Sequence, residues 1–382
     1  MASETMTKIE RLEATLAFEK ADRVLVVPQV VKSTAANYCG VSQAEAERDM
    51  EVALQCELKL YDDIGGWDAL YLDIPDSGEM QLLMWQFPLE WKRPGIELPE
   101  DGLLQCHEYE VMKFEDYDRI IEEGYRKYFL EDYAYRVMPS FEPGSVPRII
   151  QNLDDFLTQR CVPEWNKRGV STYTGWAGNH PFFQLSLSRS LLKFTEDVYR
   201  HPDVVERVIK VMSDEMIAAA VEDHKKNKAK CTFMVEERVP YYPPAVFERF
   251  WWPTVVELVH TMWADGTVTI FHLDTDWARY LPYFKRDLPK ASYMLQLDST
   301  TDIFAAKELL RGHAMFHGDV PAALQALGTV EEIELYCKRL IDEVGYEGGF
   351  ILGTGCDSAP DCKFENLLAL VNTGKTYELS KK

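Results

Sequence analysis

The second half of the chain alternates short apolar segments with longer amphipathic ones, and no other feature constrains the fold as strongly. From about residue 148 onward, segments of strand length recur at Ser171–Trp176, Cys231–Val235, Thr267–His272, Tyr293–Leu297, Ala314–His317 and Phe350–Gly353. Segments with helical spacing lie between them, for example Asp203–His224, Val246–Ala264 and Thr329–Val344. Strands that alternate with helices in this way are typical of parallel βαβ units.

Two earlier segments bring this set close to the eight strands of an α/β barrel. Val24–Pro28 has the composition of a buried strand, and a second strand is predicted near Ala69–Leu72. Neither an internal repeat nor a flexible linker divides the 382 residues, a length that suits a barrel with insertions. We therefore predict an α/β fold, a (β/α)8 TIM-type barrel, in which residues 1–382 form a single domain.

The first third of the chain adds an N-terminal helical segment and a β-rich insertion to the predicted barrel. Thr7-Lys8-Ile9-Glu10 has the pattern of a capping box, and residues 32–66 are amphipathic with helical spacing. Between residues 67 and 115, turn motifs separate the aromatic residues Trp67, Tyr71, Trp85, Phe87 and Trp91. This pattern predicts strands and hairpins. We expect the insertion 67–115 to form either a lid over a site or part of a subunit interface.

The charge and the cysteines argue against several classes of function. The chain has 41 Lys and Arg against 63 Asp and Glu, a net charge of −22, which repels nucleic-acid backbones and anionic membrane surfaces. The first twenty residues lack an apolar stretch and the longest apolar runs have strand length, so we expect neither a signal peptide nor a membrane span. The 8 cysteines include no Cys-x-x-Cys pair, and we expect them to be thiols in the reducing cytoplasm.

Metal-binding residue types follow the predicted strands, at the places where a barrel carries its catalytic groups. The carboxyl ends of the strands meet in one mouth. The candidates that follow a predicted strand are Glu236, Glu237, His272, Asp274, Asp298, His317 and Cys356. Imidazole, thiolate and carboxylate are the ligands of a catalytic zinc ion. Because His272 and Asp274 are two residues apart, they share one side of a strand and can share one ion.

Each candidate also has an ordinary structural role. A histidine at a strand end is more often a hydrogen-bonded structural group, which is the interpretation we favour for His180 and His317. A lone Cys356 packs in a core more often than it binds a metal, and Glu236 and Glu237 have the alternative of a solvated charge pair. The joint placement of His272 and Cys356 at strand ends favours the metal site for these two.

Aromatic residues near the same strand ends suggest a surface for an aromatic ligand. Trp176 and Phe182 follow one predicted strand, and Tyr241 and Trp251 flank proline-rich turns near Glu237. Core packing is their ordinary role, and a flat apolar wall is the alternative. Under that alternative, the candidate substrate-binding residues are Trp176, His180, Phe182, Trp251, Asp298 and His317.

Several short motifs, taken in their order and spacing, resemble the uroporphyrinogen decarboxylase superfamily. Arg11-Leu12 and Asp22-Arg23-Val24 are similar to its opening helix and first strand, and Asn179-His180-Pro181-Phe182 to the start of its central helix. Phe271-His272-Leu273-Asp274 and Phe350–Asp357 are similar to its last strands. The resemblance implies one of two activities. One is decarboxylation of a tetrapyrrole without a cofactor, and the other is zinc-dependent methyl transfer to or from a corrinoid protein.

Two local features favour the methyltransferases within this resemblance. The decarboxylases carry an arginine-rich segment after the first strand, whereas residues 29–35 contain no arginine. The methyltransferases carry a His-x-Cys pair and a distant Cys as zinc ligands, and His272 and Cys356 match the first and last of these. Asp274 stands in place of the middle Cys, so the third ligand is either Asp274 or Glu237.

A carboxylate in place of a thiolate makes a zinc site harder, which favours an oxygen substrate over a thiol. With the aromatic residues, the resemblance implies an O-demethylase component that moves the methyl group of a methoxylated aromatic compound to the Co(I) of a corrinoid protein. Zinc would stabilise the phenolate, and Glu236, Glu237 or Tyr241 would protonate it. The resemblance also implies a homodimer.

Three alternatives remain open. They are a methyltransferase that acts on a thiol such as coenzyme M, a metal-free decarboxylase, and a non-catalytic module that binds a corrinoid or another small molecule. The cluster of ionisable residues at the strand ends argues most strongly against the last of these.

Overall fold

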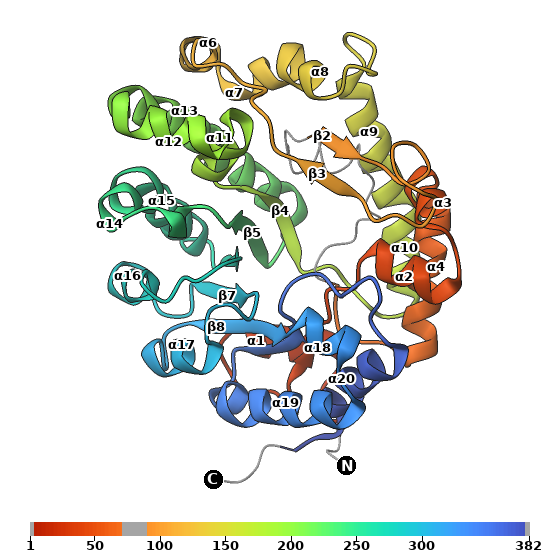
Figure 1. The fold of residues 1–382 in the computed structure, drawn as a ribbon. Coiled ribbons are helices and arrows are strands. Elements are labelled where there is room, and N and C mark those ends of the chain that lie inside the picture. The colour runs from red at the N-terminus through yellow and green to blue at the C-terminus, as the bar shows by residue number, and fades with distance from the viewer. Residues whose placement is uncertain (1–3, 71–89, 379–382) are drawn as a thin grey trace.

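The computed structural model describes residues 4–70 and 90–378, which form an α/β barrel with its helices outside a parallel sheet (Figure 1). Neighbouring strands in the sheet follow the order β1-β9-β8-β7-β6-β5-β4. The strands are β1 (Leu25–Val26), β4 (Thr174–Asn179), β5 (Cys231–Glu236), β6 (Val268–Leu273), β7 (Tyr293–Leu297), β8 (Met315–Val320) and β9 (Phe350–Thr354). The predicted α/β barrel is therefore confirmed, whereas a single domain over residues 1–382 stays a prediction.

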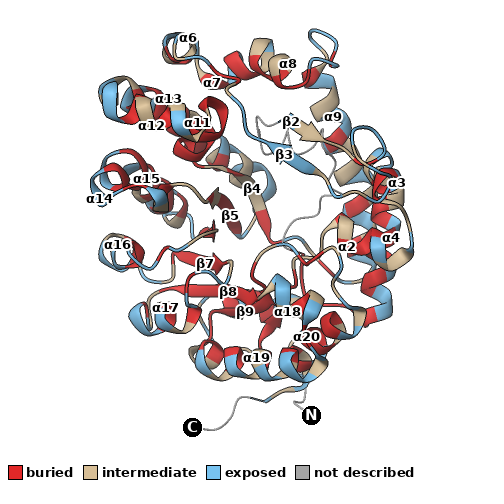
Figure 2. Ribbon diagram, viewed as in Figure 1, coloured by how far each residue is buried: buried red, intermediate tan, exposed pale blue. Residues whose placement is uncertain are grey.

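Helices surround the sheet, and their outer faces are exposed while the strands are buried (Figure 2). Before β4 lie α1 (Lys8–Leu16), α2 (Lys32–Cys39), α3 (Gln43–Arg48), α4 (Met50–Ile64), α6 (Asp116–Glu123), α7 (Tyr125–Tyr128), α8 (Ala134–Val137), α9 (Val146–Phe156) and α10 (Val162–Lys167). After β4 lie α11 (Pro181–Arg189), α12 (Leu191–Arg200), α13 (Pro202–Asn227), α14 (Pro244–Val246), α15 (Trp252–Trp263), α16 (Leu281–Asp287), α17 (Ile303–Leu309), α18 (Ala322–Leu327), α19 (Val330–Glu343) and α20 (Phe364–Thr376). Among the described residues, none of these helices is long and apolar enough to cross a bilayer.

Local sequence signals explain where several helices begin and break. The capping box predicted at Thr7 and Glu10 is present at the start of α1. The helix predicted over Val246–Ala264 is instead interrupted by a π-helical turn at Phe247–Trp251, just before Pro253. Proline has no backbone N–H to donate, and its ring collides with the carbonyl four residues earlier, so the regular hydrogen-bond pattern cannot continue through this point.

Residues 67–70 close the barrel between its first strand and β4. The backbone N–H of Asp68 donates to the carbonyl of Val26 at 2.9 Å. On the other side, the N–H of Leu70 donates to Ser171 at 3.0 Å, and the N–H of Tyr173 donates to Leu70 at 3.3 Å. This pairing confirms an extended segment at Ala69 and Leu70, while Tyr71 and Leu72 lie outside the described residues.

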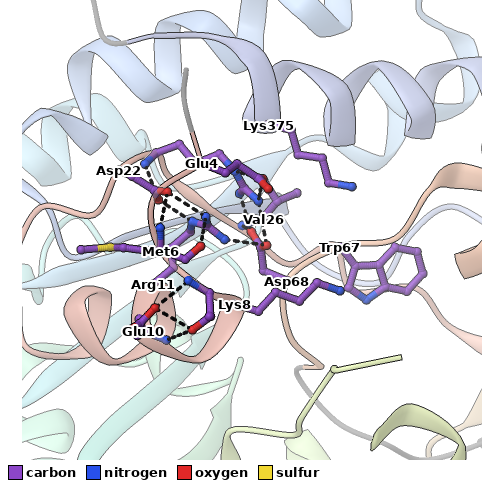
Figure 3. A network of polar contacts seen from close by, with 12 residues as sticks. Glu4, Met6, Lys8, Glu10, Arg11, Asp22, Val26, Trp67, Asp68 and Lys375 are labelled. Atoms are coloured by element: carbon purple, nitrogen blue, oxygen red, sulfur yellow. Dashed lines mark hydrogen bonds and ion pairs between the residues drawn. The ribbon is translucent and has the colours of Figure 1, made fainter. Parts of the chain in front are cut away.

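The side chain of Asp68 holds this closure together (Figure 3). Its carboxylate accepts hydrogen bonds from Arg11 at 3.1 Å, from Arg23 at 2.6 and 2.9 Å, and from the backbone N–H of Val26 at 2.9 Å. Arg11 also pairs with Asp22 at 2.8 Å. The side chains of Asp68, Arg11 and Arg23 are almost completely buried, at 0%, 1% and 3% exposure. One carboxylate therefore joins α1, β1 and the closing segment.

The barrel interior is apolar at its lower levels and polar at the mouth. Side chains from successive strands fill the apolar part: Leu25, Val27, Ala69, Tyr173, Cys231, Phe233, Val268, Ile270, Met294, Met315 and Ile351. Inward-facing residues alternate along a strand, so the next inward positions on β6, β7 and β8 are His272, Gln296 and His317. These three lie side by side in the parallel register.

The predicted β-rich insertion is described in part. Strands β2 (Glu90–Lys92) and β3 (Gln105–His107) pair antiparallel, with Trp91 opposite Cys106. Trp91 packs against the cluster formed by Phe183 and Leu187, so the β2–β3 pair lies against α11. The aromatic residues Tyr71, Trp85 and Phe87 lie outside the described residues.

Replacing Asp68 with alanine should destabilise the whole barrel. Asp68→Ala leaves two buried guanidinium groups without the carboxylate that they share, and breaking a buried ion pair costs about 3–5 kcal/mol. Urea unfolding should show a loss of this size in the free energy of unfolding. The control is Asp214→Ala, which removes an exposed partner of Lys210 and should cost less than about 1 kcal/mol. Equal losses in the two variants would contradict the role of Asp68.

Candidate metal centre

Three predicted ligands converge at the mouth of the barrel. His272 lies near the end of β6, Asp274 follows that strand directly, and Cys356 follows β9. The Nε2 atom of His272 lies 3.3 Å from Asp274 Oδ2 and 3.5 Å from Cys356 Sγ. Within residues 4–70 and 90–378, this is the one group of at least three His, Cys, Asp or Glu residues whose ligand atoms all lie within 4.8 Å of one another.

The spacing of these atoms fits a tetrahedral zinc ion. Zn–N and Zn–O bonds of about 2.0–2.1 Å and a Zn–S bond of about 2.3 Å place the nitrogen about 3.3 Å from the oxygen and about 3.6 Å from the sulfur. The observed distances of 3.3 and 3.5 Å agree with both values. His272 is buried, whereas Asp274 and Cys356 are half-buried, so the group is accessible from one side. Three protein ligands leave a fourth position open, as in catalytic zinc sites.

The charges of the three groups depend on one another. Burial lowers the pKa of His272, but the neighbouring Asp274 and Cys356 outweigh it, and the pKa rises well above its usual value. Burial raises the pKa of Asp274, yet His272 brings it below the usual value. Burial raises the pKa of the Cys356 thiol. A proton on His272 Nε2 thus occupies the space that a cation would take, and a bound metal ion would displace it.

The geometry separates the two candidates for the third ligand. Asp274 belongs to the group that could hold a metal ion, and Glu237 does not. Glu237 instead accepts a hydrogen bond from Arg238 Nε at 3.1 Å. Its backbone carbonyl accepts from the hydroxyl of Thr275 at 3.1 Å, which ties together the loops after β5 and β6. The observed arrangement favours Asp274 as the third ligand.

Glu236 has a structural position that does not suit the predicted role as an acid at the mouth. Its side chain is buried, and Oε1 accepts the N–H groups of Glu237, Arg238 and Val239 at 3.1, 2.8 and 3.1 Å. Burial raises its pKa to about 8, although the N–H groups of Arg238 and Val239 oppose this shift. Because side chains alternate along β5, Glu236 points away from the interior that Val235 faces. It holds the turn after the strand.

Tyr241, in contrast to Glu236, is exposed. It ends a short 3-10 turn, Val239–Tyr241, and its side chain is 62% exposed. Of the three predicted proton donors, Glu237 is therefore the one that is both half-buried and next to the loop that carries Asp274.

Three of the predicted substrate-binding residues lie in the core, which corrects the aromatic wall proposed for them. Trp251 is fully buried and packs against Trp252, Trp277 and Phe271. Phe182 is also fully buried, with edge-on contacts to Phe194 and Tyr242. These side chains fill the space between the sheet and the outer helices, where Phe271 faces outward from β6. They cannot line the mouth.

His180 also has the structural role that the sequence favoured. Its Nδ1 atom accepts the N–H of Phe182 at 3.0 Å, which caps the first turn of α11. Burial lowers its pKa to about 3. A neutral, buried imidazole at a helix start explains the His-Pro-Phe sequence without a ligand.

The remaining substrate-binding candidates lie closer to the mouth. His317 is buried in the inward polar layer, and its Nε2 atom donates to the carbonyl of Val27 at 3.0 Å. Asp298 accepts the N–H of Thr275 at 2.9 Å and that of Thr300 at 2.8 Å, so it braces the loop after β6. Trp176 is half-buried on β4, and its ring lies over Gly178, where a Cβ would come within 2.6 Å of the ring.

The sequence analysis missed two features of the site. Gln296 of β7 accepts a hydrogen bond from His272 Nδ1 at 2.8 Å. A lone polar residue inside the apolar strand Tyr293–Leu297 is the signal that points to it. Val235 of β5 lies next to His272 in the register and packs against the Phe183 and Leu187 cluster, as Trp91 does, so it forms an apolar side of the mouth. Two separate segments meet there, which strand patterns alone do not reveal.

Comparison with known proteins places this site in a family. The family model for uroporphyrinogen decarboxylase (URO-D) matches residues 185–377, which are 193 of the 382 residues. No curated protein matches the sequence significantly.

Among solved structures, a methyltransferase from Methanosarcina mazei matches with a TM-score of 0.65 at 17% sequence identity, over 97% of this chain and 99% of that chain. A chitinase from Chromobacterium violaceum ATCC 12472 matches with a TM-score of 0.31 at 11% identity, over 46% of this chain and 75% of that chain, and carries no weight here. The barrel fold and the family match, which includes β5 to β9, agree, and the chain belongs to the uroporphyrinogen decarboxylase family.

Proposed function

We propose that the protein is a zinc-dependent methyltransferase that moves the methyl group of a methoxylated aromatic compound to the Co(I) of a separate corrinoid protein. The observation that carries this proposal is the convergence of the His272, Asp274 and Cys356 ligand atoms, all within 4.8 Å of one another, in the mouth of the barrel. The fold shared with the Methanosarcina mazei methyltransferase over 97% of the chain supports it.

The cations near the mouth argue against decarboxylation of a tetrapyrrole that carries several carboxylates. Lys32 is the first cation after β1, and it is buried in an ion pair with Glu47. Arg238 pairs with Glu108 at 2.5 Å and with Glu237 at 3.1 Å. Both cations are already neutralised by carboxylates of the protein, and an acidic mouth repels a polyanion.

The proposed reaction needs three contributions from the chain. His272, Asp274 and Cys356 would hold the zinc ion, and Val235, which is next to His272 in the sheet, would offer the aromatic ring an apolar surface. When bound, zinc supplies a Lewis acid to the ether oxygen. As the O–CH3 bond breaks, the methyl group passes to the corrinoid and the oxygen keeps the electron pair. Of the predicted donors, Glu237 would supply the proton that this oxygen takes up, and it would first take up a proton itself, because its carboxylate is paired with Arg238.

Asp274 is the feature that favours an ether over a thiol. A site with two thiolates is soft and suits a sulfur substrate, whereas a site with one thiolate and one carboxylate is better matched to oxygen. Methylation of a thiol such as coenzyme M is the competing activity, and the identity of the third ligand should decide between the two.

Loss of either His272 or Cys356 should abolish metal binding. His272→Ala and Cys356→Ala should each lose the bound zinc, about one ion per chain, together with demethylation of a methoxybenzoate in the presence of cob(I)alamin. Metal content is measured by plasma mass spectrometry and folding by circular dichroism. The control is Cys362→Ala, which removes a half-buried thiol six residues further on and should keep the zinc. Full zinc content in a folded His272→Ala variant would contradict the site.

Metal removal separates the methyltransferase from a decarboxylase. Wild-type protein treated with a chelator should lose methyl transfer, and added zinc should restore it, because the Lewis acid is required at the ether oxygen. Methylcobalamin formation is followed by its visible absorption. Decarboxylation of a porphyrinogen that persists after chelation would instead support the metal-free alternative.

Changing the third ligand should change whether the protein prefers an oxygen or a sulfur substrate. Asp274→Cys creates a site with one imidazole and two thiolates, so zinc should stay bound while demethylation of the ether falls and methylation of coenzyme M from methylcobalamin rises. The control is Asp276→Cys, which places the same thiol at an exposed position two residues away. If Asp274→Cys demethylates the ether as fast as the wild type, the carboxylate does not set the substrate class.

A further inference from the structure

We propose that Gln296 is a positioning residue for the metal centre, and that a directed chain of hydrogen bonds from Asp357 through Gln29 and Gln296 fixes which nitrogen of His272 faces the ion. This inference deepens the proposed function because it needs a metal ion at His272, but it requires no particular substrate.

The hydrogen-bond chain consists of three consecutive side-chain contacts. Gln29 Nε2 donates to Asp357 Oδ1, and Gln296 Nε2 donates to Gln29 Oε1 at 2.9 Å. The Nδ1 atom of His272 lies 2.8 Å from Gln296 Oε1. The four residues come from the segments after β1 and β9 and from strands β6 and β7, so the chain crosses the mouth of the barrel.

The direction of these bonds follows from the chemistry of the first residue. Asp357 Oδ1 accepts from the NH2 group of Gln29, so the carbonyl of Gln29 faces Gln296. That carbonyl in turn requires the NH2 group of Gln296, which leaves the Gln296 carbonyl for His272. A carbonyl can only accept, so His272 Nδ1 must carry a proton.

The proton on Nδ1 determines the state of Nε2, the other nitrogen of the His272 ring. With its proton on Nδ1, a neutral His272 has its lone pair on Nε2, and this is the atom that faces Asp274 and Cys356. Metal-bound histidines commonly donate their other N–H to a fixed acceptor, which sets the tautomer and the ring orientation. Here the acceptor is the Gln296 amide, whose orientation is set by Asp357 at the far end of the hydrogen-bond chain.

Neighbouring residues keep the Gln29 and Gln296 amides from reversing their orientation. Gln296 is completely buried, between His272 and His317 in the register of the sheet. The backbone N–H of Gln29 donates to Thr354 Oγ1 at 3.0 Å, and its carbonyl accepts from Ser358 at 2.8 Å. A reversed Gln296 would place its carbonyl oxygen against that of Gln29 and lose the hydrogen bond between the two amides. The backbone of Gln29 is thus hydrogen-bonded to Thr354 and Ser358, which lie two residues before and after Cys356. The tautomer of His272 and the position of the Cys356 thiol therefore depend on the same residue.

The test compares two substitutions of Gln296 that differ in the ability to accept a hydrogen bond. Gln296→Met removes the acceptor and should weaken zinc binding about 10–100-fold. Gln296→Glu keeps an acceptor for His272 Nδ1 and should bind zinc at least as tightly as the wild type. Affinity is measured by competition between the full-length protein and a chromophoric chelator. The absorption spectrum of the Co(II)-loaded protein gives a second readout that does not depend on turnover, and it should change in Gln296→Met alone.

Gln325 offers a matched control. It is 1% exposed, lies on α18 outside the barrel, and its amide donates to the carbonyl of Val320 at 2.9 Å. Gln325→Met should leave zinc affinity and the Co(II) spectrum unchanged. Equal zinc affinities for Gln296→Met and wild type would overturn the positioning role, as would equal weakening by Gln296→Met and Gln325→Met. A wild-type protein that binds no zinc would overturn the proposed function itself.

Discussion

The buried carboxylate of Asp68 is the interaction on which the rest of the barrel depends. Its backbone pairs with Val26, and its side chain gathers Arg11, Arg23 and the N–H of Val26 around one point. A parallel sheet with two open edges would have no interior and no mouth. Because this carboxylate joins the first strand to the segment that closes the circle, it determines that the strand ends face one another across a common space.

Closure of the barrel determines which side chains surround the mouth at the carboxyl ends of the strands. The interior changes from an apolar packing of Ile270, Met294 and Met315 to a polar layer of His272, Gln296 and His317 within one step along β6, β7 and β8. The apolar part excludes water from below, and the loops above supply the carboxylate and the thiol. A cation held there is exposed to substrate from one direction only, which suits a reaction in which a large partner must approach.

Much of the barrel was predictable from the sequence because strands such as Phe350–Gly353 are apolar throughout and are separated by helical patterns. His272 and Cys356 were also within reach, since each lies at or just after a strand end. Side-chain direction was harder to infer. Glu236 follows Val235 and so faces the turn, and Trp251 lies in the helical layer, where it packs against Phe271 on the outer face of the sheet. The choice between Asp274 and Glu237 depends on the path of two loops, for which composition carries no signal.

The order of the strands in the sheet has a consequence for biosynthesis. The first strand, β1, pairs with the last, β9, and Cys356 follows β9 directly, 84 residues after His272. During synthesis, His272 and Asp274 therefore leave the ribosome well before Cys356 does. Until β9 has been made, the emerging polypeptide presents two members of the group formed by His272, Asp274 and Cys356. The complete group of three therefore forms together with the strand that pairs with β1.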